Sequence, residues 1–146
     1  MTTEHERGLL DTNILILRRW IDPADLPHAV AISAVTLAEL SAGVHLVHGN
    51  DRNARAERAR RTDILQRAEN EFDPIPFEAD AARIFGRISA AVVSAGRTRR
   101  QRIADLMIAS IAAAEELPLY TTNPDDFTGL AGIVEIVQIR RPEANR

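Results

Sequence analysis

The chain has no cysteine and no lysine among its 146 residues. The absence of cysteine excludes disulfides, thiolate zinc sites and cysteine nucleophiles, and it fits the cytoplasmic location that we expect. Aromatic residues make up 4% of the chain and are scattered, so they form no platform on which single-stranded bases could stack. No apolar run approaches the ~20 residues that span a bilayer. The polar, acidic N-terminal residues lack the features of a secretory signal, so we expect neither membrane insertion nor export.

The composition is that of an ordinary globular protein, with 45% apolar and 27% charged residues. A length of 146 residues predicts a single domain that spans 1–146. The formal net charge of -3 argues against a generic nucleic-acid binder. The 18 basic residues are nevertheless all arginine, which contacts phosphate through two parallel hydrogen bonds. They include two clusters, namely Arg52, Arg55, Arg58, Arg60 and Arg61, then Arg97, Arg99, Arg100 and Arg102.

Neighbouring acids distinguish the two arginine clusters. Asp51, Glu57 and Asp63 are interleaved with the first cluster, which favours a solvated helix face. The second cluster has no acid between Arg97 and Arg102, so phosphate contact and a solvated loop are equally open interpretations. We therefore take this second cluster as the candidate RNA-binding segment.

Short apolar runs alternate with longer segments of helical periodicity. The patterns predict strands at 8–10, 30–33, 119–121 and 133–139, a short extended segment at Ile75, and helices at 14–20, 36–48, 50–71, 78–95 and 103–116. Short strands joined by long helices favour an α/β fold with a central parallel sheet covered by helices. Such sheets carry their sites beyond the carboxyl ends of the strands, where Asp11 and Asn123 are expected.

Two acidic residues near predicted helix starts have both a capping and a functional interpretation. Asp11 ends the first strand and precedes Thr12-Asn13, so it could simply cap the following helix. Thr36 and Glu39 have the spacing of a capping box, in which the glutamate bonds back to a free amide. On spacing alone, capping is the stronger interpretation for Glu39.

Asp105 is harder to explain as a structural residue. Ile108, Ala109 and Ala112 follow it at helical spacing, which places the carboxylate on a stripe that otherwise looks buried. A buried carboxylate is costly unless it is paired or bound to a metal. An ion pair with Arg102 is the alternative to a metal. Three acids, each at the start of a separate element, suggest a shared Mg²⁺ or Mn²⁺, because these ions prefer carboxylate and water oxygens.

Four segments, taken in order, resemble the motifs of PIN-domain nucleases, and specifically of the VapC toxins. Leu9-Leu10-Asp11-Thr12-Asn13 is similar to the first motif, and Ser33 to Leu40 is similar to the second, with Glu39 as its acid. The segment from Ile103 to Ala109 resembles the third motif, with Asp105 as its acid, and the segment from Tyr120 to Phe127 resembles the fourth. The resemblance covers residues 8 to about 139. No single motif is specific, but the ordered set is.

The resemblance implies a three-layer α/β/α PIN-like fold and an endoribonuclease that depends on Mg²⁺, with Mn²⁺ as a substitute. It also implies a toxin that blocks growth by cleaving RNA, forms a homodimer and is inhibited by a VapB-type antitoxin. Asp11, Glu39 and Asp105 would hold the metal, and Thr12, Asn13 and Thr122 would support them. The fourth motif carries Asn123 where many members have aspartate, so Asn123, Asp125 and Asp126 compete for the fourth catalytic position, with Asn123 and Asp126 as our candidates.

Two other function classes are alternatives to this interpretation. A haloacid-dehalogenase-like phosphotransferase, or a receiver domain, also places an acid after its first strand. The first uses an Asp-x-Asp motif, whereas this chain has Asp11-Thr12-Asn13, and both commonly use a lysine, of which this chain has none. The other alternative is a non-catalytic RNA-binding PIN protein, and a test of metal-dependent cleavage separates it from an enzyme.

Overall fold

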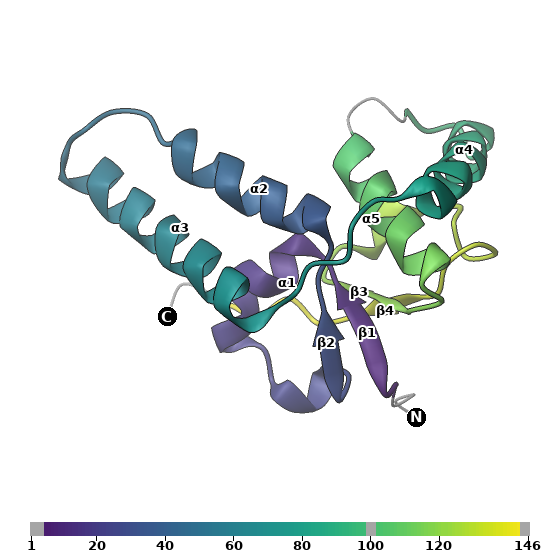
Figure 1. The fold of residues 1–146 in the computed structure, drawn as a ribbon, viewed down its shortest axis with the longest axis horizontal. Coiled ribbons are helices and arrows are strands. Elements are labelled where there is room, and N and C mark those ends of the chain that lie inside the picture. The colour runs from purple at the N-terminus through teal and green to yellow at the C-terminus, as the bar shows by residue number, and fades with distance from the viewer. Residues whose placement is uncertain (1–4, 99–101, 144–146) are drawn as a thin grey trace.

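The computed structural model describes residues 5–98 and 102–143 (Figure 1). Four short strands form one parallel sheet in the order β2-β1-β3-β4. The strands are β1 (Arg7–Leu10), β2 (Ala29–Ala31), β3 (Leu119–Thr121) and β4 (Ile136–Gln138). The α-helices are α1 (Thr12–Leu17), α2 (Ala34–His45), α3 (Arg52–Glu71), α4 (Ala79–Ser94) and α5 (Ile103–Ala114). Short 3₁₀ turns are η1 (Arg18–Trp20), η2 (Pro23–Asp25) and η4 (Pro124–Phe127).

Successive residues of the central strands point to opposite faces of the sheet. Leu9 of β1 and Leu119 of β3 belong to the core that α4 and α5 cover. Leu10 and Tyr120, one position later, belong to the core on the other face, which α1, α2 and α3 cover. The predicted three-layer α/β/α fold is therefore confirmed, and Figure 1 shows the two helix pairs on either side of the strands.

Close packing between the two central strands requires a glycine in β1. A Cβ atom built on Gly8 would lie 2.5 Å from the Tyr120 ring and 2.9 Å from Pro27. Any larger residue would push β1 away from the ring that packs beside it. This contact allows β1, which leads to Asp11, to lie close to β3.

The predicted helices and strands are present, but several boundaries differ from the prediction. The second helix begins at Ala34 rather than Thr36, because Ser33 Oγ accepts a hydrogen bond from the Thr36 N–H at 3.1 Å and caps it. It ends at His45, three residues before His48. The last strand is confined to Ile136–Gln138, because the segment before it forms turns rather than extended backbone.

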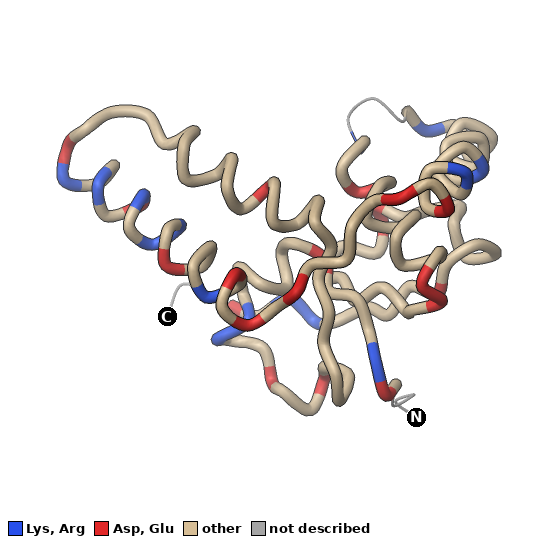
Figure 2. The backbone as a smooth tube through the Cα atoms, in the orientation of Figure 1, with Lys and Arg blue, Asp and Glu red and all other residues tan. Residues whose placement is uncertain are grey.

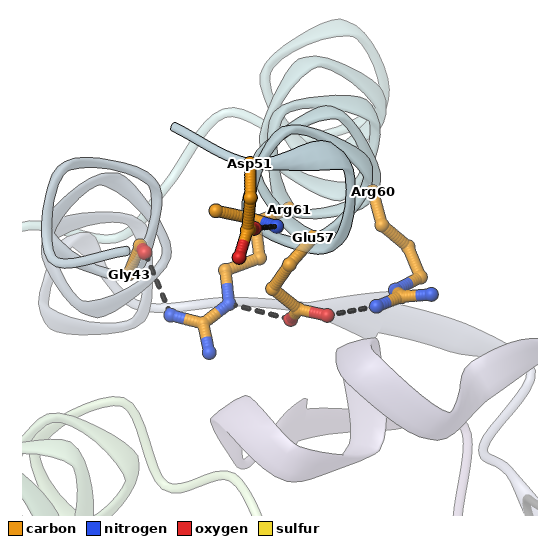
Figure 3. A network of polar contacts seen from close by, with 6 residues as sticks. Gly43, Asp51, Glu57, Arg60 and Arg61 are labelled. Atoms are coloured by element: carbon orange, nitrogen blue, oxygen red, sulfur yellow. Dashed lines mark hydrogen bonds and ion pairs between the residues drawn. The ribbon is translucent and has the colours of Figure 1, made fainter. Parts of the chain in front are cut away.

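The first arginine cluster is a structural part of the α2–α3 hairpin (Figure 3). Glu57 lies between two arginines: Arg61 Nε donates to Glu57 Oε1 at 2.8 Å, and Arg60 pairs with Oε2. Arg61 also donates from Nη1 to the Gly43 carbonyl oxygen at 2.7 Å, which ties α3 to α2. Acidic and basic positions are interspersed along α3 in Figure 2. This agrees with the predicted solvated, charge-paired face.

Candidate active site

The first acid of the site lies where β1 ends beside β3. The backbone N–H of Asp11 donates to the Tyr120 carbonyl oxygen at 2.9 Å, which continues the parallel ladder up to the aspartate. The side chain of Asp11 is only 3% exposed. Its Oδ1 accepts from the Thr12 N–H at 2.9 Å, and its Oδ2 accepts from Thr121 Oγ1 at 2.9 Å. The capping role is thus present, but it uses one lone pair of one oxygen and leaves others for a cation.

Glu39 extends from α2 towards Asp11. The capping box that the spacing of Thr36 and Glu39 predicts is wrong. Ser33, not Thr36, caps the helix. The carboxylate of Glu39 instead accepts a hydrogen bond at 2.6 Å from Oγ1 of Thr12, at the start of α1. Because Thr12 directly follows Asp11, this bond holds the glutamate beside the first aspartate.

Asp105 lies in the first turn of α5. The ion pair with Arg102, which is the alternative to a metal at this residue, is not formed. Arg102 Nη1 bonds Oδ1 of Asp126 in η4 at 2.7 Å. Asp105 is half-buried, and the three residues that follow it at helical spacing, Ile108, Ala109 and Ala112, are all fully buried, as predicted. Its charge therefore lacks a close cationic partner among the described residues.

Burial and the negative charge of neighbouring carboxylates raise the pKa of Asp11 and of Asp105. Burial, followed by the negative charges of Asp11, Asp126 and Glu39, raises the pKa of Asp105 to about 7, while Arg102 opposes the shift. Burial also raises the pKa of Asp11, more than its bonds from Thr121 and Thr12 lower it, and Glu39 and Asp126 add to the increase. Four acids therefore share one region where negative charge is unfavourable without a cation.

One groove of about 1150 Å³ exposes three of these acids to a ligand. Asp11, Glu39 and Asp105 line it together with Thr12 and Asn13. The donor set consists of oxygens only, which fits Mg²⁺ or Mn²⁺ in chemistry. Within residues 5–98 and 102–143, however, no three acidic or histidine side chains are already arranged to ligate one ion. A cation would have to draw the mutually repelling carboxylates together.

The fourth motif contributes unequally to this region. Asp126 is half-buried, and its charge raises the pKa of both Asp11 and Asp105. Asn123 has an exposed side chain, and its backbone N–H donates to Thr121 Oγ1 at 3.0 Å. Asp125 is exposed as well. Thr122 is 7% exposed, and its hydroxyl has no hydrogen-bond partner in the described part of the chain. Of Asn123, Asp125 and Asp126, only Asp126 contributes to the raised pKa values of Asp11 and Asp105.

Two threonines near the acids were missed by the sequence prediction. Thr121 Oγ1 donates a hydrogen bond to Asp11 Oδ2. The Oγ1 atoms of Thr36 and Thr12 lie 2.9 Å apart. The signal for Thr121 was available, because it ends the predicted strand at the sheet edge where Asp11 was expected. Thr36 was interpreted as a cap, which hid its side-chain contact.

The second arginine cluster is described only at its two ends. Arg97 is half-buried and follows the left-handed Gly96, whose φ of 76° ends α4. Arg102 is held by Asp126, so a phosphate would have to share its guanidinium. Arg99 and Arg100 lie outside the described residues.

Comparison with known proteins identifies the family. The PIN domain family model matches residues 9–133. Ribonuclease VapC5 of Mycobacterium tuberculosis is 37% identical over 143 residues, which cover 96% of this chain and 99% of that protein. Ribonuclease VapC8 of the same species is 37% identical over 106 residues, which cover 72% of this chain and 89% of that protein.

A solved structure agrees with these sequence relatives. The crystal structure of VapBC-5 from Mycobacterium tuberculosis, a member of the VapBC family of toxin-antitoxin systems, superposes with a TM-score of 0.76 at 36% identity. It covers 92% of this chain and 99% of that chain. The phosphotransferase alternative has no support from these matches. The chain belongs to the PIN-domain family and, within it, to the VapC ribonucleases.

Proposed function

We propose that this chain is a Mg²⁺-dependent endoribonuclease whose metal is held by Asp11, Glu39 and Asp105. The observation that carries the proposal is the convergence of these carboxylates, from β1, α2 and α5, on one groove, with the pKa of Asp105 raised to about 7. A divalent ion there would polarise the phosphodiester and supply an activated water at neutral pH. The raised pKa values of Asp105 and Asp11 mean that their ionised forms are unfavourable without a cation, which a bound divalent ion would supply.

The surrounding residues orient the acids. Thr121 and the Thr12 N–H hold the two oxygens of Asp11 in fixed directions, and the Thr12 hydroxyl holds Glu39. We assign Asp126 as the fourth acid, with Arg102 limiting its negative charge. Asn13 lines the groove and can hydrogen-bond the substrate. The Asn123 carbonyl oxygen accepts from the Asp126 N–H at 3.1 Å, which closes the turn that positions Asp126.

RNA is the substrate that fits the relatives' names and the arginines of this chain. Arg97, Arg99 and Arg100 precede α5, the helix that carries Asp105, in the sequence. Arg102 starts the same helix, but Asp126 already engages it. We propose that the first three arginines make the phosphate contacts.

The biological role follows from the same relatives. The VapBC-5 structure contains a toxin-antitoxin system. We propose that this chain is the toxin of such a pair, that a cognate VapB-type antitoxin inhibits it, and that it assembles as a homodimer. None of the helices in the described ranges could cross a membrane.

Cleavage of RNA by the purified chain tests the enzyme assignment. We expect cleavage with Mg²⁺ or Mn²⁺, none after chelation, and a loss of at least about 100-fold in Asp11→Asn and Glu39→Gln. Asp51→Asn is the matched control, because asparagine also caps α3 and the residue lies away from the groove. Binding of RNA without metal-dependent cleavage would instead identify a non-catalytic PIN protein.

A further inference from the structure

A chain of hydroxyl groups leads from the protein interior to Glu39. Thr12 Oγ1 donates to Glu39 Oε1 at 2.6 Å, and Thr36 Oγ1 lies 2.9 Å from Thr12 Oγ1. Ser33 Oγ in turn donates to Thr36 Oγ1 at 3.5 Å. Ser33 and Thr36 are both fully buried. They stand at the start of α2, one turn before the glutamate on the same helix.

The direction of each proton in this chain can be assigned. A threonine hydroxyl has one proton to donate. Thr12 gives its proton to the Glu39 carboxylate, so in its contact with Thr36 it must accept. Thr36 therefore donates to Thr12, and its own oxygen accepts from Ser33. The hydroxyls all point one way, toward the negative charge.

The hydroxyl groups differ in burial from the carboxylate that they lead to, and this difference indicates their role. The side chain of Glu39 is exposed and would sample several rotamers if it were free. Thr12 Oγ1 could also turn to solvent, since Thr12 is only half-buried. The Thr36 hydroxyl, which cannot leave its buried position, removes that freedom. A fixed interior group thus determines where an exposed carboxylate lies.

We propose that Thr36 is a positioning residue, which acts through Thr12 to hold Glu39 ready for the metal. This inference rests on the proposed function, in which Glu39 is a metal ligand. Groups that orient metal ligands typically change metal affinity or activity by about 10-fold to 100-fold when removed. We expect an effect in that range from the loss of one buried hydroxyl group that touches neither metal nor RNA.

Calorimetric titration with Mn²⁺, in the absence of RNA, tests the proposal. Thr36→Val removes the hydroxyl while keeping the branched shape, and we expect Mn²⁺ affinity to fall by about 10-fold or more. Thr36→Ser keeps the hydroxyl and should restore most of the affinity, although it leaves a small cavity. Thr62→Val is the matched control, because the Thr62 hydroxyl donates to the Arg58 carbonyl oxygen within α3, and the Mn²⁺ affinity of this variant should equal that of the wild type.

A double-mutant cycle shows whether Thr36 acts through Thr12. Thr12→Val alone should weaken Mn²⁺ binding, and adding Thr36→Val should weaken it little further, because the relay is already broken. Independent, additive losses would overturn the relay. If Thr36→Val does not fold, Thr36→Ala replaces it, because alanine places no methyl group against Thr12 Oγ1.

The outcomes separate this inference from the proposed function. Wild-type affinity in Thr36→Val, together with weakened binding in Glu39→Gln, would overturn the role of Thr36 and leave the metal site intact. No Mn²⁺ binding by the wild type would overturn both. Equal losses in Thr36→Val and Thr36→Ser would show that packing, and not the hydroxyl, is responsible, which also overturns the inference.

Discussion

At the residue scale, the helix that positions Asp105 also buries its carboxylate. Its neighbours on that face of α5 are apolar and fully buried, and three other acids contribute negative charge. The one nearby arginine that affects its pKa, Arg102, is paired with Asp126. The carboxylate is therefore poorly solvated and poorly compensated in the metal-free protein, which supports the proposed role of Asp105 as a metal ligand.

Replacing Asp105 by asparagine should separate activity from stability. The side chain keeps its shape and loses the charge, so cleavage should collapse while the melting temperature stays the same or rises, since repulsion among the acids is relieved. RNA cleavage with Mn²⁺ and a thermal melt of the metal-free variant measure the two effects. Asp51→Asn, with wild-type behaviour in both assays, is the control.

Either of two results would contradict the role of Asp105. A stable Asp105→Asn variant that cleaves at the wild-type rate would exclude a metal ligand. A variant with a sharply lower melting temperature would show that the carboxylate stabilises the native fold, as a buried ion pair would, at a cost on the order of 3–5 kcal/mol when broken.

The pH dependence of stability follows from the same residue. The pKa of Asp105 is raised from its ordinary 3.8 to about 7, so between these values the native state holds a proton that the unfolded chain releases. The metal-free protein should therefore lose stability as pH rises from about 4 to 7. Asp105→Asn should flatten that part of the profile, and thermal melts across this range measure it. Stabilisation by Mg²⁺ should grow over the same interval, because the metal binds the ionised carboxylate; a stabilisation independent of pH would contradict this coupling.

At the scale of the elements, the two arginine clusters differ in what surrounds them. In the α2–α3 hairpin, Arg58 donates to the Gly49 carbonyl oxygen and Arg61 donates to the Gly43 carbonyl oxygen. These guanidinium groups stabilise the hairpin and are not free for phosphate. The segment between α4 and α5 has no interleaved acid, and Arg97 at its start makes no ion pair within the described residues.

Replacing Arg97, Arg99 and Arg100 by glutamine should weaken RNA binding and reduce its salt dependence. Each lost phosphate contact lowers the slope of log affinity against log salt by about 0.7 for single strands. Binding of an uncleaved RNA to the metal-free protein at several salt concentrations measures the slope. We leave Arg102 in place, because its removal would also change Asp126 and so confuse the two effects.

A matched control addresses the change in net charge. Replacing Arg52, Arg55 and Arg83, which are all exposed, removes the same charge from other helices. An equal reduction of the slope in both variants would show that only total charge matters. An unchanged slope in the first variant would show that the α4–α5 segment is merely solvated.

At the scale of the whole molecule, the toxin assignment predicts growth arrest. Expression of the chain without an antitoxin should stop growth, because the free enzyme would degrade essential RNA. Growth curves, with sequencing of the cleaved RNA ends, measure the effect and identify the target. Asp11→Asn, expressed to the same soluble level, should be harmless. Normal growth with abundant folded wild-type protein would count against the toxin role.

The sequence by itself predicted the elements and, through the resemblance of its ordered motifs, the three acids that the fold brings to one groove. Alternating apolar runs and helical periodicity predicted the parallel sheet, and the order of the motifs predicted Asp11, Glu39 and Asp105. The elements were predictable because each apolar pattern is local and depends on residues within one turn or one strand. The exposed, charge-paired character of the first arginine cluster was predictable for the same reason.

Only the tertiary structure decided which partners these residues have. Glu39 could have closed a capping box on spacing alone, but the fold places Thr12, 27 residues earlier in the chain, against its carboxylate. Arg102 is three residues from Asp105, yet it pairs with Asp126, because η4 packs at the start of α5. Thr121 meets Asp11 only because β3 lies beside β1. Such contacts join distant parts of the chain, and spacing along the sequence carries no information about them.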